Sequence, residues 1–413
     1  MLARHLNLAT CAEGEEPAVK KSRTDRSEET EVVLEPWDWD FLADVVRRER
    51  FDLDEDDVKP YFELDTVVKA AFHCVHELFG LTFALLPDVA GYHPDVQVYR
   101  VTEGSGADEK LVGVFLHDNF ARVGKQSGAW MSELRGQARN GRENLPPELS
   151  CPIILNNNNF AKGQGDTPTM LSFSNVRTLF HELGHGLHGL LSDVTYQRLS
   201  GTSVLRDFVE LPSQLFEHWM EQESVLKKHF VHHQTGLPMD DALLSKLLAS
   251  QKFNQGYSTI EYTSSALVDL GLHRIGADKA DAALGHVCDT GGNPLAPLLN
   301  VDVSAFESAE TKRLGMPDGI LLRHRPSHFQ HIFSTDAYAS AYYVYLWAEV
   351  LDADAFGAFL EAGDIFDNKT ATRLRECIYS KGNSVEPGEL FRRFRGRDPD
   401  SLAMMKKKGL IDA

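Results

Sequence analysis

Two histidines stand four residues apart in the motif His181-Glu182-Leu183-Gly184-His185, within a segment of helical periodicity. Residues four apart share one face of a helix, so both imidazoles can bind a single metal ion. Apolar residues recur at steps of three and four on the opposite side: Val176, Leu179, Phe180, Leu183, Leu187, Leu190 and Leu191. The segment therefore predicts a helix with a core face and a metal-binding face, capped by Ser172 or Ser174.

The donors in this motif suit zinc. Two neutral imidazoles and one carboxylate fill three positions of a catalytic zinc site, and water takes the fourth. Glu182 lies beside the histidines, where it can take a proton from that water and deliver it to a leaving amine. We therefore expect one Zn2+ per chain, with His181 and His185 as ligands, Glu182 as the general base and amide hydrolysis as the chemistry.

The third ligand must come from another element, because one helix offers only two well-placed donors to a tetrahedral ion. Polar residues recur opposite an apolar face in a second predicted helix: Asp207, Glu210, Gln214, Glu217 and Glu221. Pro212 is tolerated only in a first turn or at a kink, so Glu210, the expected ligand, lies near the helix start. Asp207 is expected to accept the second ring proton of a ligating histidine. Glu217 and Glu221 are interpreted as a solvated face.

Two alternatives remain open for this motif. His188, one turn beyond His185, is a rival third ligand, although three histidines on successive turns splay along the helix axis. The other alternative is a pair of solvated histidines on a surface helix.

The segment from Leu179 to Trp219 carries the histidine motif, Ser200-Gly201-Thr202 and Asp207-Phe208-Val209-Glu210-Leu211-Pro212-Ser213-Gln214. It resembles the thimet oligopeptidase family of zinc metallopeptidases, which are of the gluzincin type. The similarity extends from about Trp37 to Leu410. Several segments resemble the bacterial peptidyl-dipeptidase branch most closely: Pro60-Tyr61-Phe62, Tyr92-His93-Pro94-Asp95-Val96, 125–131 and 324–354. The resemblance implies that His181, His185 and Glu210 bind zinc and that Glu182 is the base.

The resemblance also implies roles for aromatic residues later in the chain. Tyr338, Tyr342 and Tyr345 match family tyrosines, and their spacing of four and three places the phenols on one face of a predicted helix. Phenols directed at a developing oxyanion would stabilise it, a role we expect for Tyr345 and Tyr338 rather than that of a structural aromatic stripe. His331 matches a position close to the substrate, and a buried structural histidine is an equal alternative.

We expect a mainly α fold with a small antiparallel β-sheet beside the active-site helix, the α+β zincin-like catalytic domain that the resemblance implies. Helical patterns cover about 39–50 and 64–81, β-strand patterns lie at 96–101, 111–117, 128–134 and 152–155, and helices dominate from 172 onward. An edge strand beside the ion would pair with an extended peptide. Residues 13–35 are charged and poor in aromatic side chains, so the segment 1–35 is predicted to be disordered. Residues 36–413 are predicted to form the metallopeptidase domain, without the family's N-terminal helical region.

Composition restricts the partners and the compartment. The formal net charge of −19 disfavours nucleic acid and anionic membranes, which require basic surfaces. The five cysteines are scattered and odd in number, which predicts reduced thiols and a cytoplasmic location. The first dozen residues lack acidic side chains and contain Arg4, which leaves a mitochondrion or plastid as the alternative.

Together these features predict a zinc metallopeptidase that hydrolyses short oligopeptides, as an oligopeptidase or a peptidyl-dipeptidase. Release of C-terminal dipeptides needs a group that binds the terminal carboxylate, and Arg323, Arg325 and the tyrosines are unranked candidates. A partner chain that supplies the missing N-terminal region is a further expectation. The alternative function is a truncated, catalytically impaired remnant or subunit that binds zinc and peptide.

Overall fold

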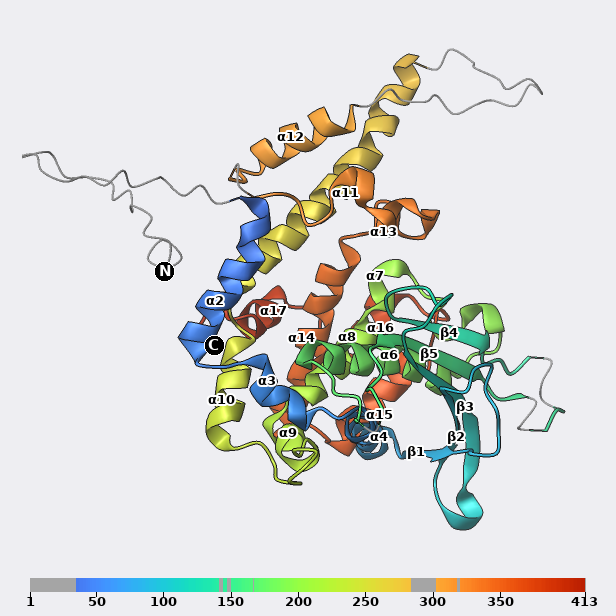
Figure 1. The fold of residues 1–413 in the computed structure, drawn as a ribbon. Coiled ribbons are helices and arrows are strands. Elements are labelled where there is room, and N and C mark those ends of the chain that lie inside the picture. The colour runs from blue at the N-terminus through green and yellow to red at the C-terminus, as the bar shows by residue number, and fades with distance from the viewer. Residues whose placement is uncertain are drawn as a thin grey trace, which may run out of the picture.

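The computed structural model describes residues 35–140, 144–146, 150–165, 167–283, 302–317 and 320–412. The segment 1–35, predicted to be disordered, lies outside these residues except for Glu35. Helices make up most of the described chain, and a five-stranded sheet lies at one end of the molecule (Figure 1). Each helix in these ranges is too short or too polar to cross a lipid bilayer.

The sheet has the strand order β1-β2-β3-β5-β4. Its strands are β1 (Leu81–Leu85), β2 (Val96–Glu103), β3 (Lys110–Phe120), β4 (Trp130–Arg135) and β5 (Ile153–Phe160). Five of the eight residues of β2 are buried, including the neighbours Val98 and Tyr99 and the neighbours Val101 and Thr102, so side chains on both faces of this strand are covered. The small predicted sheet is therefore confirmed, and β1 and β4 are its two edges.

The sheet is mixed rather than wholly antiparallel, which corrects the prediction. Strands β3 and β5 run parallel, with Leu116 opposite Leu155, while the other pairs are antiparallel. Parallel neighbours need a long connection, and here that connection contains β4, which folds back along the outer side of β5. Alternating hydrophobicity identifies a strand but not its direction, so the sequence pattern left this arrangement open.

Helix α6 (Phe173–Leu191) lies between the sheet and α8 (Leu211–Met220) and carries the histidine motif. Ser172 begins it, because its side chain accepts a hydrogen bond from the backbone N–H of Asn175 at 3.1 Å. Two glycines allow close packing on either side. A Cβ at Gly184 would lie 2.6 Å from Cα of Ser213 in α8, and one at Gly189 would lie 2.6 Å from the Ile154 side chain in β5.

Glu210 stands at the junction of two short helices. The residue ends α7 (Arg206–Val209) and begins α8, and its backbone is αR with φ −84° and ψ −10°. Pro212 occupies the first turn of α8, where its missing N–H leaves no intrahelical bond unmade. The prediction that Glu210 lies near a helix start is confirmed.

The remaining helices surround the main hydrophobic core and form an arm (Figure 1). The predicted helices near 39–50 and 64–81 are confirmed as α2 (Trp39–Phe51) and α4 (Leu64–Phe79). Helix α11 (Gln255–Ala283) runs away from the body with α2 and α12 (Val303–Arg313) beside it (Figure 1). The others are α3 (Glu55–Val58), α9 (Glu223–His229), α10 (Asp241–Ser250), α13 (Gln330–Phe333), α14 (Val344–Ala362), α15 (Asn368–Leu374), α16 (Pro387–Arg395) and α17 (Ser401–Lys407).

Candidate metal centre

His181, His185 and Glu210 meet where α6 crosses the junction of α7 and α8. Nε2 of His181 and Nε2 of His185 each lie 3.2 Å from Oε2 of Glu210. The imidazole rings are nearly perpendicular, at 85°, with centroids 4.9 Å apart. Within the described residues, these side chains form the one group of donor atoms close enough to hold a metal ion, all within 4.8 Å of one another. The structure therefore brings the predicted ligands together.

The charges at this site favour a cation. Burial alone would lower the pKa of His181, but Glu210 and Glu217 raise it well above the ordinary value. Burial alone would raise the pKa of Glu210, but His185 and His181 hold it well below its usual range. The Glu210 carboxylate thus stays ionised and attracts positive charge to the imidazoles. Two imidazoles and a carboxylate are donors that zinc accepts, so the residues fit a zinc ion.

Glu217 orients His181 from the side away from Glu210. Its Oε1 lies 2.7 Å from Nδ1 of His181, and its side chain is only 17% exposed. Arg177 lies 3.7 Å from the other Glu217 oxygen and forms a 2.7 Å ion pair with Glu221. A hydrogen bond at Nδ1 fixes the tautomer that leaves Nε2 free to bind a metal. The interpretation of Glu217 and Glu221 as a solvated face is therefore wrong.

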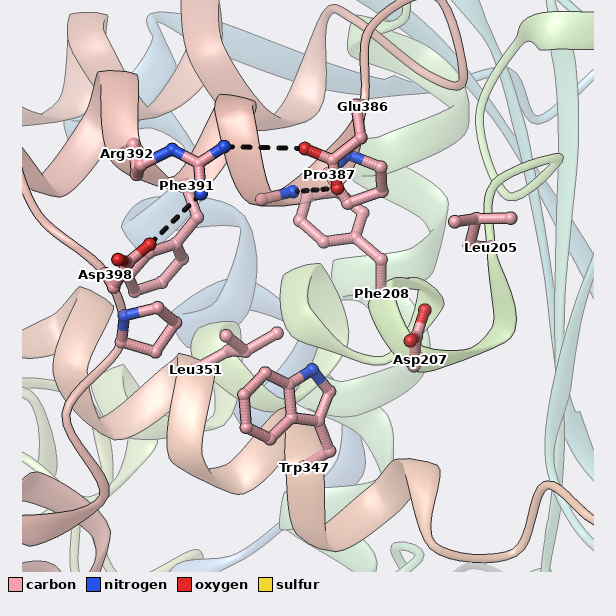
Figure 2. Close-up of a pocket in the computed structure, with 12 residues that line it drawn as sticks. Leu205, Asp207, Phe208, Trp347, Leu351, Glu386, Pro387, Phe391, Arg392 and Asp398 are labelled. Atoms are coloured by element: carbon pink, nitrogen blue, oxygen red, sulfur yellow. Dashed lines mark hydrogen bonds and ion pairs between the residues drawn. The ribbon is translucent and has the colours of Figure 1, made fainter.

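The expectation that Asp207 orients a ligating histidine is also corrected. Glu217 occupies that position at His181, and Nδ1 of His185 is buried without a hydrogen-bond partner in the described part of the chain. Figure 2 shows Asp207 in a separate cavity of about 410 Å³, beside Trp347 and Leu205. The physical reason is the helix break at Glu210, which turns Asp207 toward α14 and α16 rather than toward α6.

Glu182 lies beside the ligands with an unsatisfied carboxylate. The residue is 5% exposed, and its Oε2 has no hydrogen-bond partner among the described residues. Burial raises the pKa of Glu182, and the neighbouring His181 and His185 oppose that shift. A buried carboxylate without a partner is costly in a purely structural position. The arrangement suits a group that exchanges a proton with something bound at the site.

Tyr338, Tyr345 and His331 gather beside this centre. The Tyr345 hydroxyl lies 3.0 Å from Nε2 of His331, which is exposed rather than buried, and the Tyr338 and Tyr345 rings stack with centroids 6.1 Å apart. Burial, followed by the charge of Glu210, raises the pKa of both phenols. Both tyrosines thus lie within electrostatic reach of Glu210 and remain protonated donors.

The tyrosine segment is not the continuous helix that its spacing predicted. Tyr338 ends a 3₁₀ turn, α14 begins only at Val344, and Ser340 between them has φ +60°. The buried Asp269 of α11 accepts the backbone N–H groups of Ser340 and Tyr342 at 3.0 and 2.9 Å. Tyr342 itself is buried against other aromatic rings. Its role is therefore packing, whereas the Tyr345 hydroxyl lies within hydrogen-bond distance of His331 and the Tyr338 ring packs against the same imidazole.

Comparison with known proteins identifies the family. The sequence pattern of Peptidase family M3 matches residues 7–410. The chain belongs to this family. It is 36% identical over 404 residues to a dipeptidyl carboxypeptidase of Escherichia coli strain K12, covering 95% of this chain and 55% of that protein. It is 33% identical over 380 residues to oligopeptidase A of the same organism, covering 91% of this chain and 52% of that protein.

This M3 chain spans about half the length of the curated relatives it matches. It is also 32% identical over 387 residues to a probable cytosolic oligopeptidase A of Arabidopsis thaliana, covering 92% of this chain and 52% of that protein. A solved M32 carboxypeptidase from Deinococcus radiodurans R1 superposes with a TM-score of 0.47 at 13% identity, covering 90% of this chain and 66% of that one.

His188 is absent from the ligand group of this M3 chain. Its ring is fully buried, burial lowers its pKa to about 3, and it packs against Tyr379 with ring centroids 6.2 Å apart. Both its ring nitrogens are without hydrogen-bond partners in the described ranges. Sequence reasoning missed Glu217, and the only available signal was its step of seven residues from Glu210, which places both carboxylates on one face of a helix.

Proposed function

We propose that this chain hydrolyses short peptides with zinc held by His181, His185 and Glu210. The observation that carries the proposal is the convergence of two Nε2 atoms on one Glu210 oxygen, 3.2 Å from each. Oε2 of Glu182, which has no hydrogen-bond partner among the described residues, lies beside them. When bound, zinc supplies a Lewis acid that polarises water and the scissile carbonyl. Membership of Peptidase family M3 supports a peptidase reaction.

Glu182 moves the proton in this proposal. Because burial raises its pKa, the carboxylate takes the proton of the attacking water and holds it more readily than a solvated glutamate does. It then delivers that proton to the nitrogen of the leaving amine, so a single group serves both halves of the reaction. Its position on α6 between the two histidine ligands keeps it next to the reacting atoms.

Tyr345 and Tyr338 stabilise the oxyanion that forms when water attacks the carbonyl. Both phenols stay protonated because burial raises their pKa, so each can donate a hydrogen bond. His331 holds the Tyr345 hydroxyl at 3.0 Å and limits its rotation. In this proposal Tyr345 and Tyr338 contact substrate, and His331 positions Tyr345.

Strand β4 binds the peptide backbone. It is an edge of the sheet and packs against α6, whereas the other edge, β1, packs against α4. An extended peptide can therefore add to β4 through main-chain hydrogen bonds, close to the metal helix. Backbone recognition is independent of side chains, which fits a peptidase that accepts many short sequences.

The relatives named above are a dipeptidyl carboxypeptidase and oligopeptidases, so short peptides are the substrate class that we propose. We propose that the activity belongs to a reducing compartment, the cytoplasm, because Cys74 and Cys377 form no disulfide in the part of the chain that the structure describes. The partners that we propose are peptides, and a second chain that completes the peptide channel.

A quenched-fluorescence peptide assay on the purified chain tests this function. We expect hydrolysis with added zinc, no hydrolysis after chelation, and loss of turnover but not of zinc in Glu182→Gln. Mass analysis of the products separates dipeptide release from internal cleavage. Stoichiometric zinc without hydrolysis would select the alternative of a peptide-binding remnant.

A further inference from the structure

Arg206 lies one helical turn before the ligand Glu210. It begins α7, and Glu210 ends it, so these two side chains share one face of the same turn. The Arg206 guanidinium lies over the Tyr338 ring, 5.1 Å from its centroid. Arg206 is exposed, and its charge opposes the rise that burial causes in the pKa of the Tyr338 phenol. A cation therefore stands at the rim of the metal centre, against a phenol of the site.

The charge of Arg206 is available to a ligand. In the ranges that the structure describes, no carboxylate lies within 4.0 Å of its guanidinium, which stacks on the Tyr338 ring. A guanidinium stacked on an aromatic ring keeps N–H groups along its edge that can donate to a carboxylate in pairs. The stack thus holds the cation in place without neutralising it.

Of the other two arginines considered for this role, Arg325 is paired with a carboxylate and Arg323 lies within electrostatic reach of one. Arg325 forms a bidentate ion pair with Glu307, with Nη2 2.9 Å from Oε2. Arg323 lies close enough to Glu261 to oppose the rise that burial causes in the pKa of that carboxyl. Arg325 is thus paired with a carboxylate, whereas no carboxylate of the described residues lies within 4.0 Å of the Arg206 guanidinium.

We infer that Arg206 binds the C-terminal carboxylate of the peptide and so restricts cleavage to the release of C-terminal dipeptides. A step of four residues advances about 6 Å along a helix axis. Two extended residues, from the scissile carbonyl to the terminal carboxylate, span about 7 Å. A carboxylate bound by Arg206 would thus leave the second peptide bond from the C-terminus next to Glu210 and Glu182. The inference rests on the proposed function and names the end of the substrate that it recognises.

Binding and hydrolysis of two matched peptides test this inference. An alanine-rich heptapeptide with a fluorescent label is prepared with a free C-terminal carboxylate and as its C-terminal amide. Binding is measured by fluorescence anisotropy on the zinc-loaded Glu182→Gln chain, where turnover does not interfere. Hydrolysis is measured on the zinc-loaded chain with Glu182 intact, and its products are identified by mass.

We expect the free acid to bind roughly 10- to 100-fold more tightly than the amide, the range typical of a charge-assisted contact. Arg206→Met keeps the apolar stem over the Tyr338 ring, and should bind both peptides as weakly as the parent chain binds the amide. Arg206→Lys should keep part of the preference, because an ammonium retains the charge but not the paired geometry. Arg325→Met is the matched control, because it removes a cation that is already paired with a carboxylate. This variant should keep the full preference for the free acid over the amide.

The outcomes separate this inference from the proposed function. Preference for the free acid that depends on Arg206, without hydrolysis, supports the inference and contradicts the function. Hydrolysis with equal binding of acid and amide contradicts the inference and supports the function. A preference that survives Arg206→Met, or that is lost in Arg323→Met instead, overturns the assignment to Arg206. A chain that binds neither peptide overturns both.

Discussion

Replacement of Glu217 should weaken zinc binding without touching a ligand. Glu217 accepts the Nδ1 proton of His181 across 2.7 Å and is 17% exposed, so water cannot fully replace it. Loss of a partner of this kind lowers metal affinity by roughly 10- to 100-fold. That range corresponds to about 1.4 to 2.7 kcal/mol of binding free energy.

Two substitutions of Glu217 should weaken zinc binding to different extents within this range. In Glu217→Gln the amide oxygen can still accept the Nδ1 proton, and only the charge is lost, so we expect about a tenfold weaker Kd. Glu217→Ala removes the acceptor as well and leaves the ring free to rotate, so we expect a loss near 100-fold. Arg177 neutralises part of the Glu217 charge from 3.7 Å, which also places the glutamine variant at the low end.

Competition with a chromogenic chelator near neutral pH measures the zinc Kd of each variant. Glu223→Gln is the control, because that exposed glutamate begins α9 and pairs only with Lys227 among the described residues. It should leave the Kd within about twofold of the parent chain, as expected of a surface substitution. An unchanged Kd in both Glu217 variants would refute the reasoning, since His181 would then hold its orientation without the carboxylate.

Three further predictions concern packing, catalysis and acid stability. Gly184→Ala places a Cβ 2.6 Å from the α8 backbone and should destabilise the fold by about 1–3 kcal/mol in denaturant unfolding. Gly357→Ala is the control, because its Cβ meets no atom closer than 3.5 Å, and it should leave the free energy of unfolding unchanged or raise it. Equal losses of stability in the two glycine variants would contradict this account. Tyr345→Phe should lower kcat by roughly 100-fold with zinc affinity unchanged, and an unchanged kcat would remove the phenol from the reaction. Burial alone would raise the pKa of Asp352, but Lys407, 3.1 Å away, helps to lower it. A pKa that is lower in the folded than in the unfolded chain stabilises the fold at pH values above the pKa of the unfolded chain, and this stability is lost as the pH falls below about 4. Asp352→Asn should therefore make the melting temperature fall less steeply with decreasing pH. A profile of unchanged steepness would contradict the assignment.

The sequence was sufficient for those parts of the site that a single helix determines. The spacing of His181 and His185 fixes their common face, and Pro212 fixes Glu210 near a helix start, so the ligand group could be predicted. The roles of Glu217 and Asp207 could not, because a helical pattern shows which residues share a face but not which neighbour that face meets.

The tyrosine segment and the sheet illustrate the same limit at longer range. Asp269 lies about seventy positions before Ser340 and Tyr342, yet its carboxylate binds both backbone N–H groups and interrupts the predicted helix. The direction of β5 likewise depends on which strand it meets, and not on its own residues. Both features arise from tertiary contacts that override local pattern.

The ligands come from separate helices, α6 on one side and the junction of α7 and α8 on the other. An ion bound by all three would cross-link these elements, and only in the folded chain, so metal occupancy and resistance to unfolding become a single equilibrium. Saturation at a thousand times the Kd would add about 4 kcal/mol of stability, which a thermal melt with and without zinc can measure. Cells short of zinc would then contain less of this chain and not merely an idle form of it, because the empty chain would unfold and be degraded sooner.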